Sequence, residues 1–366
     1  MTARAGAFVR PSHLAGLDRY EPGLAIERVQ ARSGLAHVVK LASNENPFGP
    51  SPLALDAVRE ALPRLHRYPD GPADALRRAL AGRLGFDAGQ VVIGNGSTDL
   101  IDLLARAFLG PEEDAVISEQ AFARFGQVVR ARNGRARLVP MRDRAHDLEA
   151  MAAAVGPATR LVYVANPNNP TGTWSRRREV DALVRALPDG VVLVLDEAYH
   201  EYADDPDYPD GLEYVRAGAP VVVLRTFSKV YGLAGLRVGY GIASAEIVDC
   251  LDSVREPFNT NTLGQVAALA ALEDRAHVAK AVALNRVEKA RLAAELNRRG
   301  FGTLPSLANF LCVDLGREAA PVFRSLLDRG VIVRPLGAYA LPNALRVSVG
   351  APEENDALLA ALDAGV

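Results

Sequence analysis

The sequence has few cysteines, few lysines and no long hydrophobic run. Its 366 residues include only two cysteines, Cys250 and Cys312, too few for a disulfide framework or a thiolate metal site. This scarcity fits a reducing compartment, so we expect a cytoplasmic protein. The longest strongly apolar stretches, such as residues 191–195, are far shorter than the roughly 20 residues that a membrane-spanning helix needs. We therefore expect no membrane as a partner.

An excess of charge of one sign is also absent. The 42 Lys and Arg residues and 44 Asp and Glu residues give a formal net charge of -2. Nucleic acids and anionic membranes attract proteins with a strong positive charge, so we expect no nucleic acid as a partner. Because only four basic residues are lysines, each lysine is a candidate for a specific role: Lys40, Lys229, Lys280 and Lys289.

Short apolar runs alternate with longer amphipathic stretches through the middle of the chain. The apolar runs read as buried strands, and the stretches between them carry apolar residues at helical spacing. Strand and helix alternate in this way in mostly parallel sheets covered by helices. The sequence therefore predicts an α/β domain, with strands at residues 91–93, 115–117, 161–164, 191–195 and 221–224.

A second, smaller α+β domain is predicted at the C-terminal end. One long helical pattern covers residues 263–299 and would bridge the two domains. Strands at 310–315, 331–334 and 345–349 and helices at 319–328 and 354–362 follow it. The N-terminal stretch contains scattered prolines and reads as an arm. We place the arm at residues 1–46, the large domain at 47–264 and the small domain at 265–366.

Ligands of open parallel sheets bind at the carboxyl ends of the strands, so the residues that follow each apolar run matter most. Residues 94–98, Gly-Asn-Gly-Ser-Thr, lie between a strand and a helical pattern. Backbone N–H groups at such a helix start suit a phosphate, although a tight turn capped by Ser97 or Thr98 explains the same residues. A dinucleotide fingerprint is incomplete here, because Asp99 stands where its last glycine belongs.

Asp196 and Lys229 each follow an apolar run. A carboxylate at the end of a buried strand is unfavourable unless a cation or a strong donor meets it, and helix capping is the alternative reading. A buried lysine has a lowered pKa and forms Schiff bases, whereas a surface lysine in a loop is the alternative for Lys229.

Two further segments could contribute to a ligand site. Residues 166–172, Asn-Pro-Asn-Asn-Pro-Thr-Gly, form an extended turn that presents asparagine side chains. Arg346 lies inside a strand pattern, where its guanidinium could bind a carboxylate or a phosphate. Turn formation alone, or an edge strand facing water, would explain these residues equally well.

Together these segments resemble the fold-type I pyridoxal-phosphate aminotransferases. The resemblance to the histidinol-phosphate aminotransferase family is closer, extends from about residue 20 to the end and rests on residues 41–47, 67–70, 196–199 and 226–240. It implies an α/β large domain with a mostly parallel seven-stranded sheet flanked by helices and a small α+β C-terminal domain. It also implies a homodimer with shared active sites.

The resemblance assigns a role to each candidate residue. Lys229 would bind pyridoxal 5'-phosphate as a Schiff base and move a proton, Asp196 would pair with the ring nitrogen, and Tyr199 would bond the phenolic oxygen together with Asn169. The ring and phosphate would be held by Asn95, Gly96, Ser97, Phe122, Thr226, Ser228 and Arg237, and by Tyr68 of a second subunit.

The resemblance also implies the substrates. Tyr20, Asn46, Arg334 and Arg346 would bind glutamate or 2-oxoglutarate and histidinol phosphate in alternating half-reactions, a ping-pong scheme. Histidinol phosphate has no carboxylate, so the Arg346 guanidinium would take its phosphate instead. A broad aromatic aminotransferase and a decarboxylase of threonine phosphate remain alternatives.

Two other readings explain less of the sequence. A dinucleotide-dependent oxidoreductase would account for residues 94–98 but not for Lys229 or residues 166–172. No metal is expected, because the His200-Glu201 pair lacks a second histidine at the zinc-motif spacing, where Asp204 stands.

Overall fold

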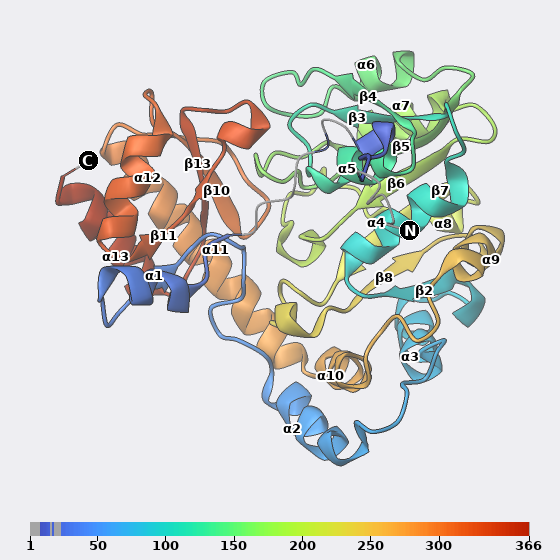
Figure 1. Cartoon of the computed structure of the whole chain (residues 1–366), viewed down its shortest axis with the longest axis horizontal. Helices are drawn as coiled ribbons and strands as arrows, with labels where there is room; N and C mark the ends of the chain where they lie inside the picture. The colour runs from blue at the N-terminus through green and yellow to red at the C-terminus, as the bar shows by residue number, and fades with distance from the viewer. Residues whose placement is uncertain (1–7, 15–16, 18–22, 366) are drawn as a thin grey trace, which may run out of the picture.

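The computed structural model describes residues 8–14, 17 and 23–365 (Figure 1). Two groups of elements make up the fold. We call residues 52–273 the large unit and residues 302–363 the small unit, and the long helix α11 (Arg275–Arg298) runs between them. No helix within the described ranges is long and apolar enough to cross a membrane.

The large unit is built on a seven-stranded sheet with the order β2-β8-β7-β6-β5-β3-β4. Neighbouring strands are parallel except at β8, which is antiparallel to both β2 and β7. This confirms the predicted α/β fold with a mostly parallel sheet. The strands are β2 (Val91–Gly94), β3 (Asp114–Ser118), β4 (Arg135–Val139), β5 (Thr159–Ala165), β6 (Val192–Asp196), β7 (Val221–Thr226) and β8 (Gly239–Ile242).

Alternate residues of each strand pack into two different cores, one on each face of the sheet. On β6, Val192 and Val194 belong to one core, and Leu193 and Leu195 belong to the other. The first core includes α4 (Ser97–Phe108), α5 (Arg124–Ala131) and α9 (Ala245–Val254). The second includes α2 (Pro52–Ala61), α3 (Asp74–Leu84), α6 (Leu148–Ala153), α7 (Arg177–Ala186), α8 (Leu212–Arg216) and α10 (Thr262–Glu273). Because helices cover both faces, the strands read as continuous apolar runs.

The small unit has its own four-stranded antiparallel sheet and its own core. The strand order is β12-β13-β10-β9, and the red and orange elements of Figure 1 lie together, with α1 (Ile26–Ser33) beside them. The elements are β9 (Gly302–Thr303), β10 (Phe310–Asp314), α12 (Ala319–Asp328), β12 (Arg334–Pro335), β13 (Ala344–Ser348) and α13 (Pro352–Asp363).

Two sequence predictions are wrong in detail. The single helix predicted at 263–299 is two helices, α10 and α11, because the Asp274 carboxylate accepts a hydrogen bond from the His277 backbone N–H and starts a new helix. The single strand predicted at 331–334 is also split. Its first half, β11 (Val331–Ile332), pairs with β1 (Val39–Lys40), whereas β12 pairs with β13. The predicted arm thus adds a strand beside the small unit, and the domain boundaries remain predictions.

Candidate functional site

The sheet topology brings the candidate residues to one edge. Asp196 ends β6 and pairs with Ala165, the last residue of β5, and with Leu224 near the end of β7. Since β8 runs the opposite way, it begins where β7 ends, and Gly239 pairs with Thr226. The segment before β8, which contains Arg237, therefore reaches the same edge as Asp196.

A hollow at this edge, which we call the strand-end hollow, is lined by most of the predicted site residues. The predicted residues that line it are Ser97, Phe122, Asn169, Asp196, Tyr199, Thr226, Ser228, Lys229, Arg237, Arg334 and Arg346. They come from the large unit and, for the two last arginines, from the small unit, so the hollow lies between the two units.

Asp196 and Lys229 supply a carboxyl group and an amine to the hollow. Asp196 is 5% exposed, and its Oδ1 accepts a hydrogen bond of 3.1 Å from the Ala198 backbone N–H. Burial raises the pKa of Asp196 to about 6, against the opposing effects of that bond and of Lys229. Burial, reinforced by Arg346, lowers the pKa of Lys229 to about 8. The hollow therefore holds a carboxylate and an amine that is partly unprotonated near neutral pH.

Arg346 connects the two units across the hollow. Its Nη1 donates to Asn169 Oδ1 at 2.5 Å, and its Nη2 donates to the Ala42 carbonyl oxygen at 2.6 Å. Arg334 is paired with Arg346 across β12 and β13 and also lines the hollow. Two guanidinium groups on neighbouring strands suit a doubly charged anion or a carboxylate.

A second cationic corner is built around Arg237 and the start of α4. Gly96 has a φ of 83°, and a Cβ atom there would lie 2.6 Å from Arg237 Nη2, so only glycine allows this approach. Arg237 Nη1 donates to Ser228 Oγ at 3.3 Å. The backbone N–H groups of Ser97 and Thr98 have no acceptor within the described ranges. A helix start, an arginine and hydroxyl groups together form a site for an anion such as phosphate.

Some predicted site residues lie elsewhere. Asn95 is exposed, and its N–H donates to Asp99. Asn46 donates to the Val230 carbonyl oxygen and does not line the hollow. Tyr68 is 82% exposed and stacks on Phe258 with ring centres 4.8 Å apart. Tyr20 lies outside the described residues.

Three consecutive residues of the site, Ala42, Ser43 and Asn44, were not predicted from the sequence. The Ala42 carbonyl accepts from Arg346, the Ser43 carbonyl accepts from Lys229 Nζ at 3.1 Å, and Asn44 Nδ2 donates to the Tyr199 hydroxyl at 2.9 Å. Residues 41–47 stood out as a motif, but two of these contacts use backbone carbonyl groups. Residue types alone could not predict which residues of the motif face the site.

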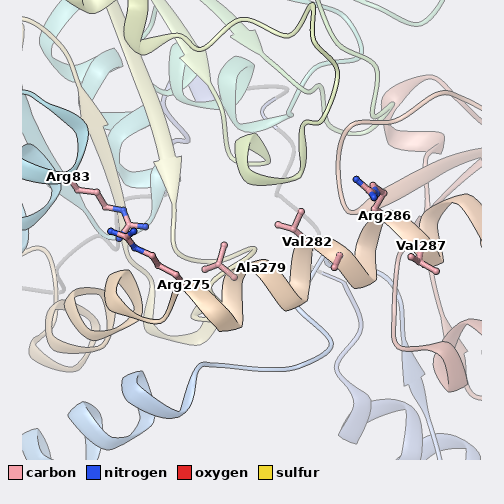
Figure 2. Close-up of a pocket in the computed structure, with 8 residues that line it drawn as sticks. Arg83, Arg275, Ala279, Val282, Arg286 and Val287 are labelled. Carbon is pink, nitrogen blue, oxygen red and sulfur yellow. The ribbon is translucent and has the colours of Figure 1, made fainter.

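A larger hollow lies along α11 (Figure 2), with a volume of about 560 Å³ compared with about 170 Å³ for the strand-end hollow. It is lined by Arg83, Arg275, Val278, Ala279, Val282, Ala283, Arg286 and Val287. None of these side chains is a nucleophile, an acid or a base at neutral pH. Its size therefore does not make it a catalytic site.

Glu197, His200 and Asp210 form a cluster with metal-ligand atoms within 4.8 Å of one another. Arg225 already supplies a positive charge there, because its Nη2 donates to Glu197 Oε2 and to Asp210 Oδ1, both at 2.7 Å. The cluster is therefore a buried ion-pair network beside Asp196 rather than a metal centre.

The chain matches known proteins over nearly its whole length. Residues 36–362 match the family model of aminotransferase class I and II. The chain is 50% identical to histidinol-phosphate aminotransferase 2 of Methylococcus capsulatus over 354 residues, 95% of each protein. It is 49% identical to histidinol-phosphate aminotransferase 2 of Pseudomonas aeruginosa over 348 residues, 94% of each.

Solved structures share the fold. The histidinol-phosphate aminotransferase of Sinorhizobium meliloti, in complex with pyridoxal-5'-phosphate, aligns with a TM-score of 0.89 at 34% identity over 97% of each chain. Aspartate aminotransferase of Thermus thermophilus with maleate aligns with a TM-score of 0.84 at 22% identity, over 97% of this chain and 99% of the other.

Proposed function

The chain belongs to the histidinol-phosphate aminotransferase family of class I and II aminotransferases, and we propose that it transfers an amino group from glutamate to the keto precursor of histidinol phosphate, and back. Its cofactor is pyridoxal 5'-phosphate. The reaction is proposed to run as two half-reactions in one hollow, with 2-oxoglutarate leaving before the second substrate binds. The observation that carries this proposal is that a buried carboxylate, Asp196, and the buried amine of Lys229 line the same hollow together with three arginines.

The residues of the strand-end hollow fit this cofactor. Lys229 Nζ is an amine that can bond an aldehyde carbon, and Asp196 is a buried carboxylate with no ion-pair partner within the described residues, as a protonated ring nitrogen requires. Ser97, Ser228 and Arg237 surround the cationic corner, where a phosphate fits. Phe122 lines the hollow and offers an aromatic face to a ring.

When bound, the cofactor supplies an electron sink for the negative charge that develops on the reacting carbon. Asp196 would place a negative charge beside the ring nitrogen and so keep that nitrogen protonated. Lys229 Nζ, whose pKa is lowered to about 8, moves the proton at the reacting carbon, because part of its population is unprotonated near neutral pH. Tyr199 and Asn169 also line the hollow, and their hydroxyl and amide groups would bond the ring oxygen.

Arg334 and Arg346 support the choice of substrate. Both side chains line the hollow, and a guanidinium group can form two parallel hydrogen bonds with a carboxylate or with a phosphate. One position can therefore hold the carboxylate of glutamate in one half-reaction and the phosphate of histidinol phosphate in the other. Tyr20 and Asn46 remain predictions as substrate contacts.

We also propose a homodimer in which Tyr68 reaches the site of the other subunit. Tyr68 is 82% exposed although it is aromatic and stacks on Phe258. Exposed leucines gather on the nearby part of the chain, as expected of an interface: Leu53, Leu55, Leu62 and Leu65.

The free thiols of Cys250 and Cys312 support a reducing, cytoplasmic location.

The proposed substrate is tested by single half-reactions of the cofactor-loaded enzyme. Histidinol phosphate and glutamate should each convert the absorbance of the bound cofactor to that of its aminated form, and 2-oxoglutarate should reverse the change. Phenylalanine, tyrosine and threonine phosphate are tested in the same way as alternative substrates. Faster conversion with phenylalanine than with histidinol phosphate would reject the substrate, and release of carbon dioxide from threonine phosphate would reject the reaction type.

A further inference from the structure

Asn44 lines the strand-end hollow beside Tyr199 and donates a hydrogen bond to the Tyr199 hydroxyl. Its Nδ2 lies 2.9 Å from the Tyr199 hydroxyl, and no other bond to that hydroxyl is found within the described parts of the chain. Asn44 is 1% exposed and has a φ of 56°. Asparagine adopts this left-handed conformation more readily than most residues.

Ser348 of β13 fixes which way the Asn44 amide points. The Asn44 backbone N–H donates to Ser348 Oγ at 2.8 Å, and the Ser348 hydroxyl then donates its own hydrogen to Asn44 Oδ1 at 2.9 Å. The Asn44 carbonyl also accepts from Asn309 Nδ2 at 3.0 Å. Because Oδ1 faces Ser348, the NH₂ group of the amide must face Tyr199.

The direction of the last bond follows from the donor inventory. An amide NH₂ group only donates, and a tyrosine hydroxyl carries one hydrogen and can accept. Tyr199 therefore accepts from Asn44, and its single hydrogen must be donated elsewhere. Tyr199 lines the hollow, and Lys229 Nζ lies 5.7 Å from the centre of its ring. The hydrogen is thus available to an acceptor in the hollow.

We propose that Asn44 is a positioning residue that makes Tyr199 a hydrogen-bond donor toward the cofactor's ring oxygen, an inference that rests on the cofactor proposed above. The small unit takes part, since Ser348 orients the amide. A donor at that oxygen would stabilise its negative charge, and this would lower the proton affinity of the neighbouring Lys229 Nζ when Nζ is bonded to the cofactor. Loss of the donor should therefore raise the pH at which that nitrogen loses its proton.

The test reverses one hydrogen bond. Asn44→Asp keeps the size of the side chain and tolerates the positive φ, but a carboxylate only accepts and would take the Tyr199 hydrogen. The visible absorbance of the cofactor-loaded enzyme is titrated with pH for the wild type, Asn44→Asp, Tyr199→Phe and the double variant. We expect Asn44→Asp to raise the midpoint pH of this absorbance titration, as Tyr199→Phe does. We also expect kcat/KM of Asn44→Asp to fall roughly tenfold, which corresponds to the loss of one hydrogen bond.

The double variant distinguishes an effect of the reversed hydrogen bond from an effect of the negative charge that Asn44→Asp introduces. If Asn44 acts through Tyr199, Asn44→Asp adds no further shift to Tyr199→Phe. An equal additional shift in the Tyr199→Phe background would overturn the proposal, because it would come from the new charge alone. An unchanged midpoint in Asn44→Asp would overturn it as well.

Ser348→Ala keeps the proposal testable if Asn44→Asp does not fold. This variant releases the amide of Asn44, so the midpoint should rise by a smaller amount, and an unchanged midpoint overturns the role of the amide. The wild-type titration distinguishes the two proposals. If the wild-type protein shows no visible absorbance band after loading, the proposed cofactor is rejected. If the wild type shows the band but the midpoint pH of the Asn44 and Ser348 variants equals that of the wild type, only the role of Asn44 is rejected.

Discussion

Arg346 Nη1 donates a 2.5 Å hydrogen bond to Asn169 Oδ1 and so joins β13 of the small unit to the turn after β5 of the large unit. The same guanidinium also donates to the Ala42 carbonyl oxygen, and its buried Nε has no partner among the described residues. An incoming anion can therefore bond a group that is already oriented. The side chain that we propose to bind substrate therefore also joins the two units.

Arg346→Lys should weaken substrate binding without loss of the cofactor. Lysine keeps the charge but not the two-point pairing, and losing hydrogen bonds to a charged group raises KM by about 10- to 100-fold. Steady-state kinetics with glutamate and with histidinol phosphate measure the effect for each substrate. Loss of the cofactor's visible absorbance in this variant would contradict the assigned role.

Asp196→Asn should lower kcat by at least about 100-fold, the usual effect of removing one electrostatic group from an active site. The amide keeps the shape of the side chain and can still accept from the Ala198 N–H, but it cannot hold a proton on the ring nitrogen. Asp204→Asn, at an exposed position near η4 (His200–Tyr202), serves as the matched control. Equal kcat values for the two variants would reject the pairing of Asp196 with the cofactor.

The stability of the cofactor-free protein should depend on pH through Lys229. Its pKa is about 8 in the folded chain and about 10.4 when unfolded, so the unfolded chain binds more protons between these values. Stability therefore rises with pH across this window, and the full penalty of burying the charge applies below pH 8.

Lys229→Met removes this penalty and should stabilise the cofactor-free protein at pH 7 by about 1–3 kcal/mol. The difference from the wild type should shrink as pH rises from 8 to 10. Thermal unfolding across this range measures it, and a difference that does not change with pH would show that the amine is not desolvated.

Complementation tests whether Tyr68 acts across a dimer. The Lys229→Ala protein should be nearly inactive alone, and the Tyr68→Ala protein should be impaired alone. A mixed dimer would regain one complete site, formed by Lys229 of the Tyr68→Ala subunit and Tyr68 of the other. Activity should therefore recover after the two variants are unfolded and refolded together. If activity does not recover although mixed dimers are present, Tyr68 does not act across the dimer. It would then contribute to the site of its own subunit or to no site.

The sequence predicted the parts of the site that follow buried strands. Asp196 comes directly after one apolar run and Lys229 follows the next one five residues later, and the topology of a parallel sheet brings such positions together. The five predicted strands of the large sheet were predictable for the same reason, since strands covered on both faces are apolar. Strand β4, which is largely exposed, and strand β8, which contains two glycines, do not form such runs and were not predicted. The break at Asp274 was missed because apolar spacing continues on both sides of it, and one capping carboxylate decides it.

Contacts made by backbone groups could not be predicted. Ala42 and Ser43 act through carbonyl oxygens, which every residue type carries. Asn44 meets Tyr199 and Ser348 across more than 150 and 300 residues of sequence, respectively. Such long-range hydrogen bonds depend on how the two units pack, and residue spacing contains no signal for them.

The most direct test of the central claim is the chemical identity of the residue that binds the cofactor. The loaded enzyme is reduced with borohydride, digested and mapped by mass spectrometry. The account predicts a pyridoxyl phosphate group on the peptide that contains Lys229, and none on Lys40, Lys280 or Lys289. A group on one of the other three lysines, or no covalent group in an enzyme that still transfers amino groups, would contradict it.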